Sequence, residues 1–188
     1  MGLSFTEELV SEYYRHDLDR KGRPKYLVSE HVQYQMPKRG VKVRGWHDID
    51  ILAIGQREIH IVQAKQYAVF ENTTKESIIS LGEYFKDAEK FVRQNYAAKN
   101  KKIRWVFVAE SMSKNMHREL NRKGIKADWV KNVIKRFLQT LYERWEPEYE
   151  KTGNISIGKE ESNLTRLLLS LTLYFDDQLV KSGLLTGL

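Results

Sequence analysis

Apolar positions along this chain recur first at helical spacing and then at strand spacing. From Ser4 to about Asp17 they fall three and four residues apart, and Ser4 with Glu7 matches the capping box that opens many helices. Tyr26 to Met36 instead alternates with a period of two, which predicts a half-buried strand. Glu30 is the one acid on the apolar face of that strand. This face is expected to hold Tyr26, Val28, Val32, Tyr34 and Met36.

Two short apolar runs, Ile49 to Ile54 and Glu58 to Ala64, come next in the chain. They are separated by Gly55-Gln56-Arg57, so they predict a tight hairpin of two largely buried strands. A helical period then covers Glu71 to about Ala97, and the apolar run from Trp105 to Ala109 predicts a central strand.

Beyond Ser111 the pattern is mainly helical. We expect helices over Lys114 to Lys123, Ala127 to about Glu146 and Glu160 to about Lys181, with Pro147, Gly153 and Gly158 separating the last two. The element order predicts an α/β fold, an αβββαβ core with a mixed central sheet and additional C-terminal helices. We expect a core over residues 1–126 and a helical extension over residues 127–188 packed on it as one domain.

Composition narrows the chemistry that this chain can perform. It has no cysteine, which excludes disulfides, thiolate nucleophiles and cysteine-bound metals. Any metal must then be held by oxygen or imidazole, which favours Mg²⁺ or Mn²⁺. No apolar run is long enough to span a bilayer, and the N-terminal residues do not resemble a signal peptide, so a cytoplasmic protein without membrane association is expected.

The charge of the chain indicates a polyanionic partner. Its formal net charge is +7 and its pI is about 9.4, and Lys and Arg side chains bind phosphates with release of counterions. Two basic segments, Lys38 to Arg44 and Lys99 to Arg104, flank the hairpin; solvated turns are the alternative interpretation. The candidate nucleic-acid contacts are Lys38, Arg39, Lys42, Arg44, Gln66 and Tyr67.

Three polar residues stand on the otherwise apolar hairpin. Asp50 begins one strand, while Gln63 and Lys65 share a face at the end of the next. The hairpin brings these ends together, and polar groups on buried strands cost free energy unless they are paired. In a hydrolase, Asp50 would hold a divalent cation, Lys65 would orient the attacking water, and Gln63 would offer an oxygen ligand. Alternatives are a simple buried Asp50–Lys65 ion pair, and Asp48 as the ligand in place of Asp50.

These residues resemble those of a known nuclease superfamily. Asp50, twelve residues and Gln63-Ala64-Lys65 look like the PD-(D/E)xK motif in its Gln-x-Lys variant. The surrounding segments, Gly45 to Ala53 and Val62 to Tyr67, are similar to stretches of Mrr-like restriction enzymes and archaeal Holliday-junction resolvases. The resemblance covers roughly residues 3 to 110.

The resemblance implies a restriction endonuclease-like fold and a Mg²⁺- or Mn²⁺-dependent phosphodiesterase that acts on DNA, often as a homodimer. It implies that Glu7 on the first helix and the Ala64 carbonyl also bind the metal; Glu8 and Glu12 are rivals for the helix position. Gln63 departs from the usual acid and should weaken metal binding.

Two other functions stay open at this stage. One is a non-catalytic DNA-binding protein that keeps the nuclease fold, and the other is a helical interaction protein. Three further polar residues near the motif are expected to be structural: Glu30 in a salt bridge at the sheet edge, His47 at the edge of the core, and His60 facing away from Gln63 and Lys65.

Overall fold

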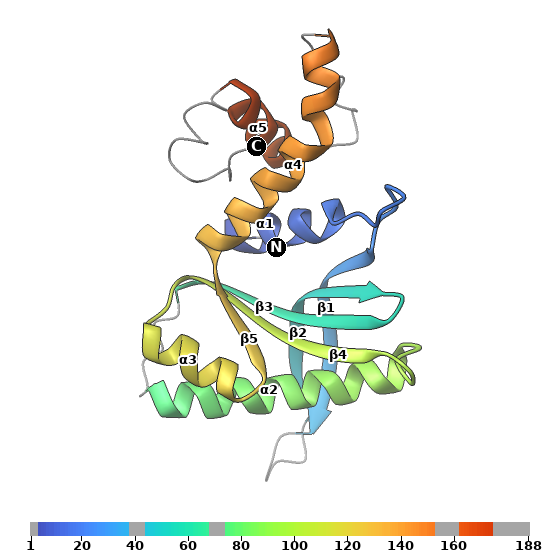
Figure 1. The fold of residues 1–188 in the computed structure, drawn as a ribbon. Coiled ribbons are helices and arrows are strands. Elements are labelled where there is room, and N and C mark those ends of the chain that lie inside the picture. The colour runs from blue at the N-terminus through green and yellow to red at the C-terminus, as the bar shows by residue number, and fades with distance from the viewer. Residues whose placement is uncertain (1–3, 38–43, 68–73, 153–161, 175–188) are drawn as a thin grey trace.

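The computed structural model describes residues 4–37, 44–67, 74–152 and 162–174. The first two thirds of the chain contain both helices and strands, and helices alone follow (Figure 1). The elements are α1 (Phe5–His16), β1 (Tyr26–Pro37), β2 (Arg44–Gly55), β3 (Glu58–Tyr67), α2 (Thr74–Asn95), β4 (Lys102–Ser111), α3 (Lys114–Arg122), β5 (Ile125–Trp129), α4 (Val130–Thr152) and α5 (Asn163–Tyr174).

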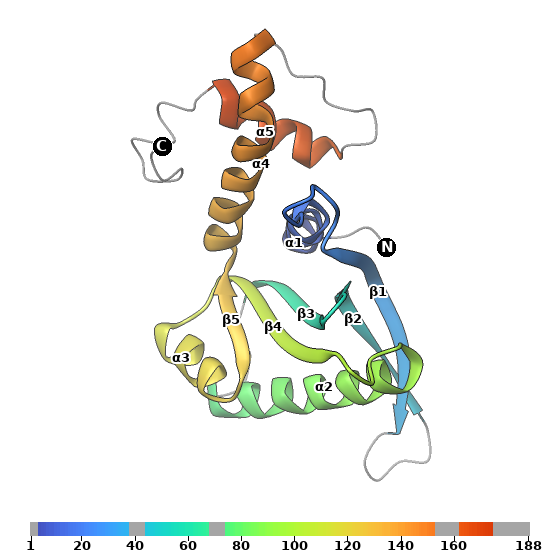
Figure 2. The same ribbon diagram turned by 45° about the vertical axis from the view of Figure 1, so that its right-hand side comes forward.

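The strands form one mixed sheet of five in the order β1-β2-β3-β4-β5. β1, β2 and β3 are joined as antiparallel neighbours, whereas β3, β4 and β5 run parallel. Helices α1 and α4 lie on one side of the sheet and α2 and α3 on the other (Figures 1 and 2). This arrangement confirms the predicted α/β class, the αβββαβ order and the mixed central sheet.

Two apolar cores lie on the two faces of the sheet. One joins β2, β3 and β4 to α2 and α3 through side chains such as Phe85 and Phe107. The other joins the same strands to α1, α4 and α5 through side chains such as Leu9 and Phe137. Because strands buried on both faces need apolar side chains at every position, β2 and β3 read as continuous apolar runs in the sequence.

The two faces of β1 exchange roles at His31, contrary to the expected alternation. Val28 packs in the core below α1, but Val32 and Tyr34 pack in the core against α2. His31 has a φ of 48°, in the left-handed region that reverses the side-chain alternation. β2 changes face at the same level, because Ile49 packs with α2 and Ile51 with α1. The two strands therefore bend together where Asp50 is located.

The segment after α3 also differs from the prediction. Ile125–Trp129 is a fifth strand, parallel to β4, although Ala127 onward was expected to be helical. Helix α4 then runs through Pro147 to Thr152, so the proline does not end the helix. α5 lies within the predicted last helix, and the rest of that prediction falls outside the described residues. No described helix combines the length and apolar character that a membrane crossing requires.

A buried polar network ties α5 back to α1. Thr165 Oγ1 donates a 2.7 Å hydrogen bond to Glu12 Oε2, and His16 Nε2 lies 3.5 Å from the same oxygen. Arg15 Nη1 contacts the other oxygen of Glu12 at 3.0 Å. Burial alone would raise the pKa of Glu12, but hydrogen bonds from His16, Thr165 and Ser162 outweigh it and hold the pKa at about 2. Glu12 is therefore a structural anion.

Candidate active site

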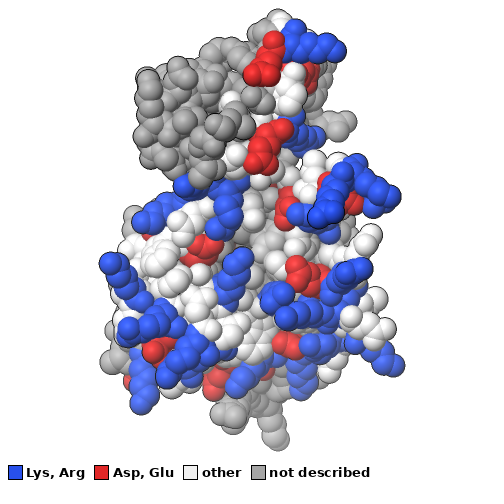
Figure 3. Space-filling model, viewed as in Figure 1, with Lys and Arg blue, Asp and Glu red and all other residues white. Residues whose placement is uncertain are grey.

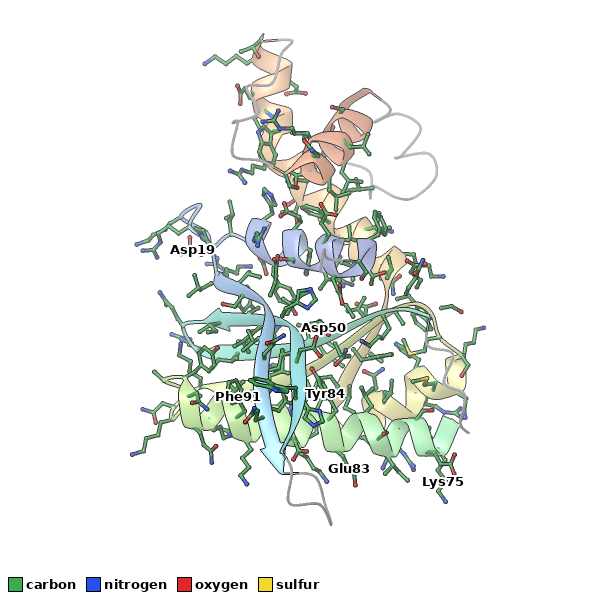
Figure 4. All side chains as sticks on the ribbon, turned by 180° about the vertical axis from the view of Figure 1, so that it is seen from behind. Asp19, Asp50, Lys75, Glu83, Tyr84 and Phe91 are labelled. Atoms are coloured by element: carbon green, nitrogen blue, oxygen red, sulfur yellow. The ribbon has the colours of Figure 1, made fainter. Side chains whose placement is uncertain are left out.

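Asp50 occupies the point where β2 and β3 begin to diverge. The last antiparallel pair of these strands joins Ile51 to Val62, so Asp50 and Gln63 stand directly beyond it. Asp50 is 2% exposed, and Gln63 is 7% exposed. In Figure 4 Asp50 lies between α1 and α2, with Tyr84 below it on α2. The bend of the β1–β2 pair thus leaves the Asp50 carboxylate inside the protein, at the edge of the two cores.

Three polar groups of β3 contact one oxygen of Asp50. Gln63 Nε2 donates a 2.6 Å hydrogen bond to Asp50 Oδ2, and the Ala64 backbone N–H donates another of 2.8 Å. Lys65 Nζ lies 3.6 Å from the same oxygen, while about half of the Lys65 side chain stays exposed. The structure therefore brings together the three residues that the hairpin pattern predicted, and it includes the Asp50–Lys65 ion pair.

The surroundings of Asp50 favour the neutral form of its carboxyl group. Burial raises the pKa of its carboxyl to about 6, although Lys65 and the Ala64 N–H act in the opposite direction. Glu7 and Asp48 raise this pKa further by repulsion, which places two more carboxylates within electrostatic reach. A cation bound at this position would relieve both the burial and the repulsion.

Glu7 and Asp48 face each other across His31. Glu7 Oε2 lies 4.0 Å from His31 Nε2, and Asp48 Oδ2 lies 3.6 Å from His31 Nδ1. Glu7 also accepts a 2.7 Å hydrogen bond from the Ser4 N–H, so the predicted capping box is present. Glu7 thus reaches the site from the first turn of α1 while it caps that helix. Asp48 is about half exposed and Asp50 is buried, which favours Asp50 as the central carboxylate.

Two other acids are used in the structure of the protein. Glu12 is engaged by α5, and Glu30 is paired with Arg15 at 2.7 Å and accepts a hydrogen bond from Ser11. The salt bridge expected for Glu30 is confirmed. Nothing in the described contacts connects Glu8 with Asp50.

His60 and His47 lie where the strand pattern predicted them. His60 lies on the α1 side of β3 and makes a 2.7 Å hydrogen bond between its Nδ1 and the Tyr14 hydroxyl, away from Gln63 and Lys65. His47 stacks on Tyr34 with 5.6 Å between ring centroids, at the edge of the α2 core.

Among the predicted nucleic-acid contacts, the structure describes the side chain of Gln66 alone. Lys38, Arg39 and Lys42 lie outside the described residues. Arg44 begins β2 and Tyr67 ends β3, but the structure describes only the backbone of each. Gln66, the remaining candidate, is exposed directly after Lys65.

The oxygen donors around Asp50 suit a hard divalent cation. Within the part of the chain that the structure describes, no three His, Asp or Glu side chains are grouped closely enough to hold a metal by themselves. Mg²⁺ is usually held by one or two carboxylates together with water and substrate phosphates, so a smaller protein set is sufficient. Asp50, Glu7 and the Ala64 carbonyl are the residues that would hold it. Gln63 would join them only after its amide turned, because it now presents Nε2 to Asp50.

Two residues near Asp50 were missed by the sequence interpretation. Tyr84 on α2 donates a 3.0 Å hydrogen bond to the Asp48 carbonyl, and burial and Asp50 raise its pKa far above the ordinary tyrosine value. His31 was assigned only to the polar face of β1. Its left-handed backbone produces the bend in β1, and no local pattern in the sequence predicts it.

Comparisons with known proteins identify no relative. No family model, no curated protein and no solved structure matches this chain.

Proposed function

We propose that this chain is a divalent-metal-dependent endonuclease of the PD-(D/E)xK superfamily that hydrolyses DNA phosphodiester bonds. The observation that carries the proposal is the convergence of Gln63, the Ala64 N–H and Lys65 on one buried oxygen of Asp50. A buried carboxylate with a pKa of about 6 is a costly arrangement, and such groups are common at functional sites. The αβββαβ core around it supports the same assignment.

Each residue of the site has a role in this reaction. The bound cation would polarise the scissile phosphate and lower the pKa of a water molecule. Asp50 and Glu7 would supply the negative charge that holds the cation. Lys65 keeps its ammonium group 3.6 Å from Asp50 with half of its side chain exposed, so it can turn toward a phosphate and stabilise the charge that develops on it.

The distribution of basic side chains supports a polyanionic substrate. Lys and Arg spread widely over the face seen in Figure 3 and leave few acidic areas. A hollow of about 400 Å³ on the sheet is lined by Lys102, Arg104 and Lys126 among others. Arg104 is paired with Glu58 at 3.2 Å, whereas Lys102 and Lys126 are both exposed. Such a surface would attract DNA before the site engages a particular bond.

A cleavage assay tests the proposal. Wild type, Asp50→Ala and Lys65→Ala would be incubated with linear duplex, single-stranded, flap and four-way-junction DNA in Mg²⁺, Mn²⁺ or EDTA. Cleavage that needs metal and disappears in both variants is the expected result. Lys151→Ala is a matched control, because it removes an exposed lysine from the last turn of α4, outside both the Asp50 site and the basic hollow, and should leave cleavage intact.

A non-catalytic DNA-binding protein is the second candidate. Gln63 donates its amide N–H to Asp50 at the position where a second acid would add negative charge for a cation, which favours this alternative. DNA binding that is insensitive to metal and to Asp50→Ala, without cleavage under any condition, would select it. A junction resolvase and an Mrr-like nuclease would be distinguished by the preferred substrate in the same assay.

A further inference from the structure

The β1–β2 pair continues beyond Asp50 as a two-stranded ribbon with unlike faces. One face packs on α2, where Tyr34 stacks on Phe91 with 5.0 Å between ring centroids. His47 stacks on the same tyrosine, and Ile49 belongs to the α2 core. These contacts fix the orientation of the ribbon, because they anchor both strands to one rigid helix.

The opposite face of the ribbon is exposed at the positions whose side chains the structure describes. In the strand register Gln33 pairs with Asp48, and Gln35 pairs with Trp46. Gln33, Gln35 and Asp48 are exposed, and Trp46 is 69% exposed. We call Gln33, Gln35 and Trp46 the ribbon platform. Trp46 lies four residues from Asp50, which corresponds to roughly 13 Å along a strand.

The ribbon platform has the chemistry of a base-binding surface. An indole that is two-thirds exposed leaves a large apolar face in water, which is costly unless a partner covers it. Aromatic side chains stack on nucleobases of any sequence, and glutamine amides can both donate to and accept from base edges. The net charge of +7 favours a polyanion such as a nucleic acid over a neutral or cationic ligand that would use the indole alone.

We propose that the ribbon platform binds unpaired nucleotides of a DNA strand beside the bond that the Asp50 site cuts. Trp46 stacks on a base, and Gln33 and Gln35 contact base edges. The bases of a duplex are stacked on each other and hide their faces, so this surface selects single strands, flaps or junctions over linear duplex. This inference rests on the proposed nuclease function, and it adds the class of substrate.

A binding experiment separates this proposal from catalysis. All proteins carry Asp50→Asn and are kept in EDTA, so that no strand is cut. Fluorescence anisotropy compares a labelled single-stranded DNA of mixed sequence with the same sequence as a duplex. Trp46→Ala should weaken single-strand binding about ten-fold, since one aromatic stack on a base contributes that order of affinity. It should change duplex binding less than two-fold.

Two further variants control the experiment. Trp46→Phe keeps an aromatic ring and should retain most of the single-strand affinity. Leu27→Ala removes an apolar side chain that is as exposed as Trp46, at 70%, but lies at the other end of β1, and it should have no effect. Quenching of tryptophan fluorescence by single-stranded DNA should be present in the Asp50→Asn protein and smaller when Trp46→Phe is added.

The outcomes distinguish this inference from the proposed function. Equal single-strand affinity of Trp46→Ala and its parent would overturn the platform, and so would an equal loss in Leu27→Ala. A parent protein that binds duplex but not single strands overturns the platform as well. If wild type shows no metal-dependent cleavage but Trp46→Ala still loses single-strand affinity, the proposed nuclease function is overturned and the ribbon platform stands.

Discussion

Gln63 Nε2 donates a 2.6 Å hydrogen bond to Asp50 Oδ2, so the residue that resembles a second acid acts as a donor to the first. An acid at position 63 would repel Asp50, whereas the amide satisfies it. Gln63 can therefore offer its carbonyl oxygen to a cation only when this hydrogen bond breaks.

Gln63→Glu should lower the stability of the metal-free protein and raise its affinity for metal. Two adjacent buried carboxylates repel each other, so the free energy of unfolding in EDTA at pH 7.5 should fall by about 1–3 kcal/mol. Mn²⁺ should bind about ten-fold more tightly, as measured by isothermal titration calorimetry. Gln66→Glu adds the same charge at an exposed neighbour and should leave both quantities nearly unchanged. Weaker Mn²⁺ binding in Gln63→Glu would contradict position 63 as a ligand position.

Asp50→Asn should stabilise the protein at neutral pH. The folded-state pKa of Asp50, about 6, exceeds its ordinary value, so the native state binds a proton more readily than the unfolded chain does. The contribution of Asp50 to stability therefore decreases as pH rises from about 4 to 6, and its ionisation above that costs on the order of 3 kcal/mol. Urea unfolding in EDTA should show the gain of Asp50→Asn at pH 7.5. The gain should largely disappear at pH 4, and a gain that persists there would argue against this origin.

Protons should compete with the metal at Asp50. A carboxylate with a pKa of about 6 is mostly ionised at pH 7.5 and mostly protonated at pH 5. Mn²⁺ affinity of the wild type should therefore be nearly constant above pH 7 and should fall up to ten-fold per pH unit below 6. Titration calorimetry over pH 5 to 8 measures this dependence. A profile that falls only below pH 4 would place the metal on an ordinary surface carboxylate.

Glu12→Gln should destabilise the protein through α5. The pKa of Glu12 is depressed to about 2, so its contribution is fully present above pH 5 and is lost as pH falls toward 2. At pH 7 the variant should lose on the order of 3 kcal/mol of unfolding free energy. Glu119→Gln removes an exposed ion pair with Arg122 and should cost less than about 0.5 kcal/mol. Equal losses in the two variants would show that the buried network has no special weight.

The hairpin and its polar residues were predictable because their pattern is local. Alternation along a strand places Gln63 and Lys65 on one face, and a tight turn brings them to Asp50. The apolar runs of β2 and β3 also announce strands buried on both faces. The apolar runs and the polar residues all lie within about fifteen residues of chain, so their prediction required no knowledge of distant contacts.

The missed features depend on contacts that the local pattern does not contain. Ile125–Trp129 is short and carries Lys126 and Asp128, and it becomes a strand because it pairs with β4 across an intervening helix. Pro147 removes one backbone donor, yet α4 continues beyond it to Thr152. The sequence assigned no position to the Trp46 side chain, which is exposed because the opposite ribbon face packs on α2.

The hydrogen bond between Thr165 and Glu12 spans 153 positions of the chain, and this separation affects the order of events during synthesis. Helix α1 leaves the ribosome before α5, and the hydroxyl group that completes the environment of Glu12 emerges 153 residues after that acid. Until then a nascent chain would carry an incompletely paired acid beside an uncovered apolar surface of α1. We expect the nascent protein to reach its native cooperativity late, once α5 has closed over the first helix.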